Sequence, residues 1–244
     1  RAVAVTGVQT CALPISALSI GIYFAEILRE RGMKSRWARG GSNKYLVKMM
    51  EDGLLDYILD GQTFDLEGVR SMRENPGHVN TSPFTSYNYH GKGNFASMVD
   101  VVILGATEVD VNFNANVVTH SDGCLLHGIG GWQNCIFSKC TILPIPLFRD
   151  RIPVIRDECT TICGPGELID VIVTERGIAI NPLRKDLIEK MKYSNLPIKT
   201  IKQLRDEAEA SCGKPDSPVF TKDPVAIIKW VDGTVIDTVW KIKK

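Results

Sequence analysis

The sequence has no long hydrophobic run and no strong excess of charge of one sign. Its longest mostly apolar stretches, such as residues 99–106, are far shorter than the roughly 20 residues of a membrane-spanning helix. The 29 basic and 28 acidic residues give a formal net charge of +1, and the basic residues gather only at Lys241, Lys243 and Lys244. The composition therefore argues against a membrane protein and a nucleic-acid binder, and favours a soluble enzyme that acts on small molecules.

The sequence also has no CxxC pair and no recognisable signal peptide. The cysteines are odd in number, and no second Cys or His pair stands at the spacing of a metal site. The pattern indicates free thiols in a reducing cytoplasm, most of them small buried side chains, and predicts no metal site. The seven cysteines are Cys11, Cys124, Cys135, Cys140, Cys159, Cys163 and Cys212.

The first residues, RAVAVTGVQTCALPIS, begin without methionine and lack the charge pattern of a targeting peptide. They resemble translated sequencing-adapter read-through more than protein. We expect residues 1–16 to be non-native and residues 17–244 to form one domain.

Helix and strand signals alternate from Ala17 onward. Apolar residues recur at helical spacing, glycines stop the helices, and short apolar runs lie between them. The predicted elements are a helix ending at Gly32, a strand at 34–38, a helix capped by Ser42, a strand at 54–59 and a helix at 64–75. This alternation predicts an α/β fold with an open, mostly parallel sheet flanked by helices.

A polar loop at 75–93 precedes the second half, which continues with short strands and ends in a β-hairpin. Capping residues and turn residues mark the ends of these elements. The predicted elements are strands at 99–104, 140–146, 152–155 and 169–174, a helix capped by Asn181, a helix opened by the capping box of Thr200 and Gln203, and a hairpin around Asp232 and Gly233.

Acid and amide side chains alternate with apolar residues along 108–117, which we interpret as one strand. The apolar residues then share one face and the polar residues the other. That polar face is either the solvated side of an antiparallel strand or the lining of a cleft, and the depletion of asparagine in strands favours the cleft. The polar residues are Glu108, Asp110, Asn112, Asn114 and Asn116.

A turn and a glycine cluster follow this segment. Ser121 and Asp122 begin the turn, and Gly128, Gly130 and Gly131 lie within four residues. The cluster is either a flexible loop or a nest of backbone N–H groups that can hold a developing oxyanion. It matches neither the Walker A pattern nor the GxGxxG spacing, so nucleotide phosphate is not the first expectation.

Three long blocks resemble the C-terminal half of the citrate lyase α subunit, the citrate CoA-transferase component. They are DVVILGATEVDVNFNANVVTHSDG, RIPVIRDECTTICGPGELIDVIVTERGIAINP and DGTVIDTVWKIKK. The shorter VTERGIA and the glycine cluster resemble the wider CoA-transferase family. The resemblance implies that residues 17–244 are a C-terminal CoA-transferase domain whose N-terminal partner domain is missing.

The resemblance also implies the reaction and the partners. A subunit of this kind moves an acyl-carrier thiol from acetyl to citrate, which releases acetate. The thiol belongs to a CoA-like phosphoribosyl-dephospho-CoA arm on the γ acyl carrier protein, and the β subunit cleaves the citryl product. No cofactor is expected to be attached covalently to this chain, and the expected location is the cytoplasm.

The resemblance further implies roles for the polar residues. Many CoA-transferases use a covalent glutamate, but the approximate matching position is Arg39–Gly41, which holds no acid. This favours direct attack by a citrate carboxylate through a mixed anhydride. The expected roles are oxyanion stabilisation by Gly128, Gly130 and Gly131, substrate binding by Asn112, Asn114, Asn116, Arg39 and Arg176, and support by Glu108, Asp110, Ser121 and Asp122.

Two alternatives to citrate transfer remain at this point. The first is a related acetyl-CoA hydrolase or transferase that uses another carboxylic acid. The second is a catalytically incomplete scaffold fragment, because half of the expected cleft is absent.

Overall fold

The computed structural model describes residues 14–82 and 98–243, and these divide into two compact units. Unit 1 contains the described residues up to Leu104 together with Asn134–Thr141. Unit 2 contains Gly105–Gln133 and the described residues from Ile142 onward. The predictions for residues 1–13, which include Cys11, and for most of the polar loop at 75–93 lie outside the described residues.

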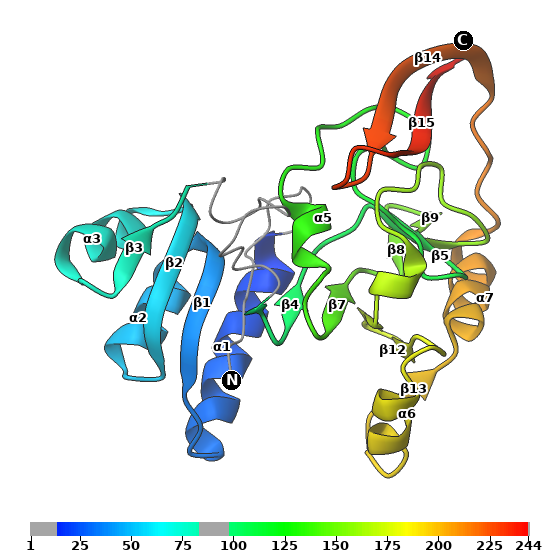
Figure 1. The fold of residues 1–244 in the computed structure, drawn as a ribbon. Helices are drawn as coiled ribbons and strands as arrows, with labels where there is room; N and C mark the ends of the chain where they lie inside the picture. The colour runs from blue at the N-terminus through cyan, green and yellow to red at the C-terminus, as the bar shows by residue number, and fades with distance from the viewer. Residues whose placement is uncertain (1–13, 83–97, 244) are drawn as a thin grey trace. The chain divides into compact units, whose positions relative to one another are not determined.

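Unit 1 is built on a parallel sheet with the strand order β1-β2-β3 (Figure 1). Helices α2 and α3 pack on this sheet, and α1 contacts α2. The elements are α1 (Pro14–Glu30), β1 (Ser35–Ser42), α2 (Lys44–Glu51), β2 (Leu55–Thr63), α3 (Leu66–Glu74), β3 (His78–Asn80) and β4 (Val102–Ile103). The predicted alternation of helices and strands is confirmed here, whereas the predicted strand at 99–104 is regular only at β4.

The N-cap of helix α2 lies one residue later than predicted. The Asn43 side chain accepts the backbone N–H groups of Tyr45 and Leu46, so Asn43 is the N-cap. Ser42 was predicted to fill this position, but its hydroxyl donates to the buried carboxylate of Asp60. The prediction of Ser42 as the cap was wrong because a tertiary partner holds its side chain.

Unit 2 contains a mixed sheet β10-β5-β6, the strands β13-β12-β11-β7 of a second sheet, and the hairpins β8-β9 and β14-β15 (Figure 1). Its strands are β5 (Glu108–Asp110), β6 (Ala115–Asn116), β7 (Thr141–Pro144), β8 (Phe148–Arg149), β9 (Ile152–Pro153), β10 (Ile155–Arg156), β11 (Val171–Thr174), β12 (Gly177–Ile180), β13 (Ile198–Lys199), β14 (Phe220–Lys229) and β15 (Val235–Ile242). The helices of this part of the chain are α5 (Trp132–Cys135), η2 (Gly166–Leu168), α6 (Lys185–Met191) and α7 (Ile201–Cys212). The predicted fold class, a mostly parallel α/β arrangement with a C-terminal hairpin, is confirmed.

Helix α7 has the predicted capping box and apolar face. Thr200 and Gln203 exchange side-chain and backbone hydrogen bonds at its start. Leu204 and Ala208 are fully buried where α7 packs on β9, β10 and β12. The capping box and the buried apolar face of α7 both follow from the local sequence, which is why the start of this helix was predictable.

The predicted cap of the preceding helix was wrong. Helix α6 has Arg184 at its N-cap and no buried residue, while Leu183 is 68% exposed. The Asn181 side chain is buried and donates to the carbonyl oxygens of Gly166 and Ile169. Its Oδ1 still accepts the Leu183 N–H at 3.0 Å, so Asn181 caps the turn that precedes α6, while two distant carbonyl groups hold its amide.

The sheet of unit 1 encloses a carboxylate, Asp60, that is only 1% exposed. It accepts the Ser42 and Thr63 hydroxyl groups at 2.7 Å each, and His78 Nε2 lies 3.3 Å away. Burial by itself raises the pKa of Asp60, but the hydrogen bonds from His78, Thr63, Ser42 and the Gln62 N–H outweigh it and lower the pKa to about 2. The ionised carboxylate thus holds the ends of β1 and β2 together.

Replacing this carboxylate is expected to destabilise the protein in a pH-dependent way. The pKa of Asp60 falls from 3.8 to about 2 on folding, so its contribution is complete above pH about 4 and is lost as the pH falls toward about 2. Asp60→Asn should lower the free energy of unfolding by about 2 kcal/mol at neutral pH. Urea denaturation of both proteins from pH 2 to pH 7 measures this difference, which should shrink below pH about 4.

Asp56→Asn is the matched control, because Asp56 lies on the same strand but is exposed and pairs with Lys34 at the surface. That change should cost less than about 1 kcal/mol. An Asp60→Asn difference that stays constant across the acid range would contradict the assignment.

Candidate functional site

The polar segment predicted as one strand is instead two short strands joined by a tight turn. β5 ends at Asp110, β6 begins at Ala115, and Phe113 between them has a positive φ of 67°. The Asp110 carboxylate accepts the backbone N–H groups of Asn112 and Asn114, which turns the chain back on itself. The prediction of a continuous strand over 108–117 was therefore wrong. Four of the five polar side chains still meet in pairs across the turn, Glu108 with Asn116 and Asp110 with Asn114.

A buried ion pair lies beneath this turn. Arg156 Nη1 is 3.0 Å from Glu108 Oε2, and the two side chains are 7% and 0% exposed. The other carboxylate oxygen of Glu108 accepts the Asn116 amide at 2.9 Å and the backbone N–H of Thr160. The pair meets because β10 runs parallel to β5, with Arg156 beside Asp110.

Two of the three asparagines complete this buried network. The Asn116 side-chain amide donates to Glu108 and to the Thr119 hydroxyl, the latter at 2.8 Å. Its side-chain oxygen Oδ1 accepts the Thr119 N–H. Asn114 donates to Asp110 and accepts the N–H of Gly166, both at 2.9 Å. The side chains of Asn114 and Asn116 are thus engaged in hydrogen bonds within the protein, whereas Asn112 is exposed. Substrate binding by the three asparagines stays a prediction, and Asn112 is the one most accessible to a ligand.

Ser121 and Asp122 line a small cavity of about 230 Å³ in unit 2. Arg156 Nη1 donates to the Ser121 carbonyl at 3.1 Å, so the buried ion pair holds this wall. Asp122 Oδ1 accepts the backbone N–H of Cys124 in the adjoining turn. The cavity is lined by Thr107, His120, Ser121, Asp122, Arg149, Asp150, Ile152 and Val154. It brings a cation, two acids and a histidine to the edge of one small space.

The glycine cluster lies in the loop before α5. Gly128 is exposed, and a side-chain carbon placed there would meet no atom of the described chain within 4 Å. Gly130 has a φ of 62°, a conformation that favours glycine. The loop geometry is compatible with backbone donors that face a ligand, and oxyanion binding by Gly128, Gly130 and Gly131 stays a prediction.

The two arginines predicted to bind substrate lie in different units. Arg39 is on β1 of unit 1 and only 1% exposed. It lies near Cys135, whose pKa burial raises to about 11 although Arg39 opposes the shift. Arg176 is exposed in the tight turn between β11 and β12 of unit 2. Their predicted roles are untested, and only Arg176 is accessible within its own unit.

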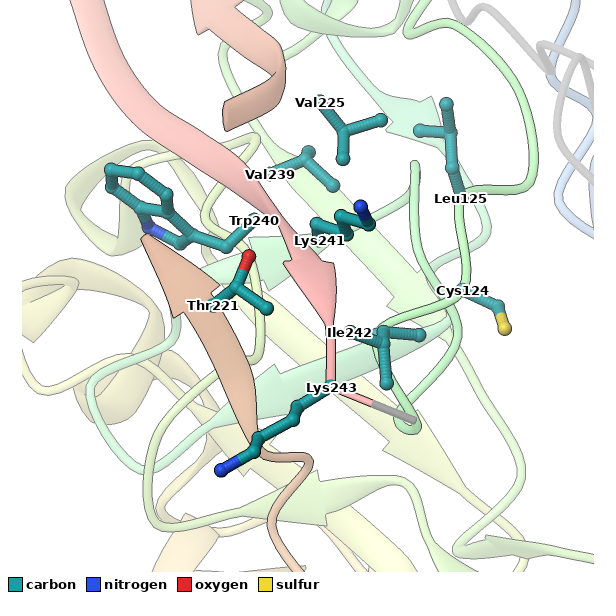
Figure 2. A pocket seen from close by; sticks show the side chains of 10 residues that line it. Cys124, Leu125, Thr221, Val225, Val239, Trp240, Lys241, Ile242 and Lys243 are labelled. Carbon is teal, nitrogen blue, oxygen red and sulfur yellow. The ribbon is translucent and has the colours of Figure 1, made fainter. Parts of the chain in front are cut away.

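A second cavity of about 470 Å³ lies between the C-terminal hairpin and the loop at Cys124 (Figure 2). Figure 2 shows Leu125 and Val225 beside it, with Val239 and Ile242 from β15. Lys241 and Lys243 also line it, so cations border a mostly apolar surface. Such a cavity suits an extended ligand that has an apolar body and anionic groups.

Residues 14–82 and 98–243 contain no group of three or more His, Cys, Asp or Glu side chains placed to bind a metal ion. No helix within the same residues has the length and apolar character that membrane crossing requires.

Cys163 is fully buried, and burial raises the pKa of its thiol to about 12. Cys135 and Cys163 match the prediction of small buried side chains, but Cys124 is exposed and Cys140, Cys159 and Cys212 are partly exposed, so the prediction was wrong for most of the described cysteines.

Comparison with known proteins decides the family. The model of the family described as citrate lyase, alpha subunit, matches residues 6–242. The chain belongs to the citrate lyase α subunit family. It is 38% identical over 229 residues to the citrate lyase alpha chain of Haemophilus influenzae and 36% identical over 230 residues to that of Escherichia coli. The predicted resemblance is confirmed.

A solved structure supports the same assignment. The crystal structure of an alpha subunit of citrate lyase from Streptococcus mutans, in complex with citrate, superposes with a TM-score of 0.91 at 36% identity. It matches 94% of this chain and 45% of that chain. The relatives from H. influenzae and E. coli are matched over 46% and 45% of their length, and 93% and 94% of this chain. The chain therefore spans about half the length of the citrate lyase α subunits that it matches.

Arg149 and Arg156 were not among the residues that the sequence predicts to have a role. Both arginines follow apolar residues at the ends of short strands, β8 and β10. An arginine directly after the apolar run at 152–155 is a weak signal for a buried pair, because it continues a strand whose other residues are in the core. Its partner Glu108 is 48 positions away, so only the fold shows that the two charges neutralise each other.

Removing the charge of Arg156 should be far more costly than removing an exposed arginine. Arg156→Met leaves the Glu108 carboxylate buried without its cation, which costs about 3 to 5 kcal/mol. Adding Glu108→Gln should recover part of that loss, because the amide carries no charge. Urea denaturation of the single and double variants measures both effects.

Arg151→Met is the control, since Arg151 is exposed in the β8-β9 turn. Its replacement should change stability by about 0.5 kcal/mol or less. Equal losses for Arg151→Met and Arg156→Met would contradict a structural role for the buried pair.

Proposed function

We propose that the protein containing this chain is the thiol-transferring α subunit of citrate lyase. It would move an acyl-carrier thiol from acetyl to citrate and release acetate. The observation that carries the proposal is membership of the citrate lyase α subunit family over residues 6–242. The likeness to a structure that contains citrate supports citrate as the acid.

The proposed reaction passes through a mixed anhydride. A citrate carboxylate oxygen attacks the acetyl thioester carbonyl, the C–S bond breaks, and the thiolate leaves. The thiolate then attacks the citryl carbonyl of the anhydride, and acetate departs with the oxygen that citrate contributed. The products are citryl thioester and acetate, and every atom of the two reactants is accounted for.

The absence of a suitable acid at the expected glutamate position supports this route over a covalent enzyme intermediate. Residues Arg39–Gly41 hold no carboxylate. Gly40 on β1 pairs with Asp60 on β2, but that carboxylate is buried and bonded to Ser42 and Thr63. With a pKa near 2, Asp60 is also a weak nucleophile. The reacting carboxylate is then best supplied by citrate itself.

Catalysis by this route rests on positioning and on stabilising negative charge. We assign the oxyanion donors to the backbone of Gly128, Gly130 and Gly131. Exposed Asn112 and Arg176 would contact substrate, with Arg39, Asn114 and Asn116 as the less accessible candidates. Glu108, Asp110, Ser121 and Asp122 would support the loops, as their hydrogen bonds with neighbouring segments suggest.

The thiol donor would be a phosphoribosyl-dephospho-CoA arm on the γ acyl carrier protein, and the β subunit would cleave the citryl product. The arm is a substrate of this chain. The cavity beside the C-terminal hairpin fits such a ligand, because its walls are mostly apolar and Lys241 and Lys243 offer charge to phosphate groups. Since the related α subunits are about twice as long, we expect turnover to need the full-length protein.

A single-turnover experiment with heavy-oxygen-labelled citrate tests the reaction. Full-length enzyme in excess is mixed with acetyl-CoA and citrate labelled in its carboxylates, and acetate is analysed by mass spectrometry. The mixed-anhydride route predicts one labelled oxygen in the acetate of the first turnover. Citryl-CoA should form in equal amount, because the thiol moves only to citrate.

Other routes give different products. A covalent glutamyl intermediate would give unlabelled acetate in the first turnover, together with citryl-CoA. Hydrolysis of acetyl-CoA would also give unlabelled acetate but no citryl-CoA. Label in acetate with succinate, and none with citrate, would identify a related transferase for another acid.

A further inference from the structure

The loop that contains the glycine cluster begins with a histidine that the proposed reaction does not yet use. His127 Nδ1 lies 2.7 Å from the carbonyl oxygen of Gly128, the next residue in the chain. A carbonyl oxygen can only accept, so Nδ1 carries the proton and donates it. The other ring nitrogen, Nε2, is shielded from solvent and has no partner among the described residues. A proton there would be a buried donor without an acceptor, which favours the tautomer protonated at Nδ1.

This hydrogen bond sets the direction of the peptide group between Gly128 and Ile129. The peptide is planar and trans, so its N–H and its C=O point in opposite directions. Because the His127 ring holds the carbonyl oxygen, the Ile129 N–H is directed away from the ring. Within the described residues the Gly128 carbonyl accepts no other hydrogen bond, and a side-chain carbon at Gly128 would meet no atom within 4 Å. The imidazole therefore orients a peptide that packing leaves free.

The N–H groups of this loop are available to a ligand. In the part of the chain that the structure describes, the backbone N–H groups of Gly128, Ile129 and Gly130 donate to no acceptor. Gly130 has a φ of 62°, and left-handed residues of this kind occur in nests of successive N–H groups that bind anions. Gly128 and Gly130 are also exposed, so no side chain covers these donors.

We propose that His127 is a positioning residue, whose Nδ1–H holds the Gly128 carbonyl so that the Ile129 N–H faces the thioester oxygen. Negative charge develops on that oxygen when a carboxylate attacks, and a donor that is already oriented stabilises it. No bond to His127 forms or breaks, and its proton stays on Nδ1. The inference rests on the proposed function and deepens it, because it names a donor outside the three glycines and the side chain that orients this donor.

Kinetics of His127 variants of the full-length protein separate the hydrogen bond from the ring. His127→Phe keeps a ring but has no donor, and should lower kcat for transfer from acetyl-CoA to citrate about 10- to 100-fold, because a stabilising group is misplaced. The KM values for both substrates should change less than about twofold, since the oriented donor acts mainly in the transition state. His127→Asn should keep kcat within about threefold of the wild type, because its amide nitrogen can donate from the place of Nδ1.

Infrared difference spectroscopy of bound acetyl-CoA gives a second readout that needs no turnover. The acetyl-CoA carries heavy carbon at its thioester carbonyl and is bound without citrate. A hydrogen bond from the Ile129 N–H polarises this carbonyl and lowers its stretching frequency relative to free acetyl-CoA. The lowering should persist in His127→Asn and disappear in His127→Phe.

His120→Phe is the matched control, because His120 is exposed and its imidazole forms no hydrogen bond within the described residues. Its kcat and its infrared spectrum should equal those of the wild type. Thermal unfolding checks that each variant is folded. If His127→Phe fails to fold, a comparison of His127→Leu with His127→Asn decides the matter, because leucine resembles asparagine in shape but has no donor.

An unchanged kcat in folded His127→Phe, or an equal loss in His127→Phe and His127→Asn, would overturn the inference. The proposed function fails separately. If the infrared shift depends on His127 but the wild type transfers no thiol to citrate, the positioning role stands and the transferase assignment falls. If transfer proceeds equally well in wild type and His127→Phe, the transferase assignment stands and the positioning role falls.

Discussion

The ion pair between Glu108 and Arg156 is the interaction on which unit 2 depends. Both side chains are almost completely buried, so each charge requires the other. Through these two residues, the turn after β5 is joined to the segment that contains Thr160 and to the carbonyl of Ser121. One buried pair therefore positions three segments that are far apart in the chain.

The small cavity is a consequence of that arrangement. Its wall at Ser121 is held by Arg156, and its Arg149 donates to the carbonyl of Thr107, next to Glu108. The hydrogen bonds of Arg149 and Arg156 to backbone carbonyls lower the free-energy cost of burying their charges. The same logic applies in unit 1, where hydrogen bonds keep the buried carboxylate of Asp60 ionised. Both units use buried carboxylates to hold strands together.

Local signals predicted much of the fold. The capping box of Thr200 and Gln203, the stop at Gly32 and the hairpin turn at Gly233 each depend on residues within a few positions. Where a side chain had a distant partner, prediction failed. Ser42 is a good capping residue by type, but the Asp60 carboxylate holds its hydroxyl. Asn181 accepts the Leu183 N–H as a cap does, but the carbonyls of Gly166 and Ile169 hold its amide and α6 begins only at Lys185.

By itself the sequence determined the family, the alternation of helices and strands in unit 1 and the C-terminal hairpin, because these follow from long matching blocks and short-range periodicity. Only the tertiary structure decided which polar residues are internal supports and which face a cavity. Alternation along 108–117 could not show that Asp110 would turn the chain, or that Arg156 would neutralise Glu108. The reason is physical: whether a charge can be buried depends on a partner that the fold, not the local pattern, brings within reach.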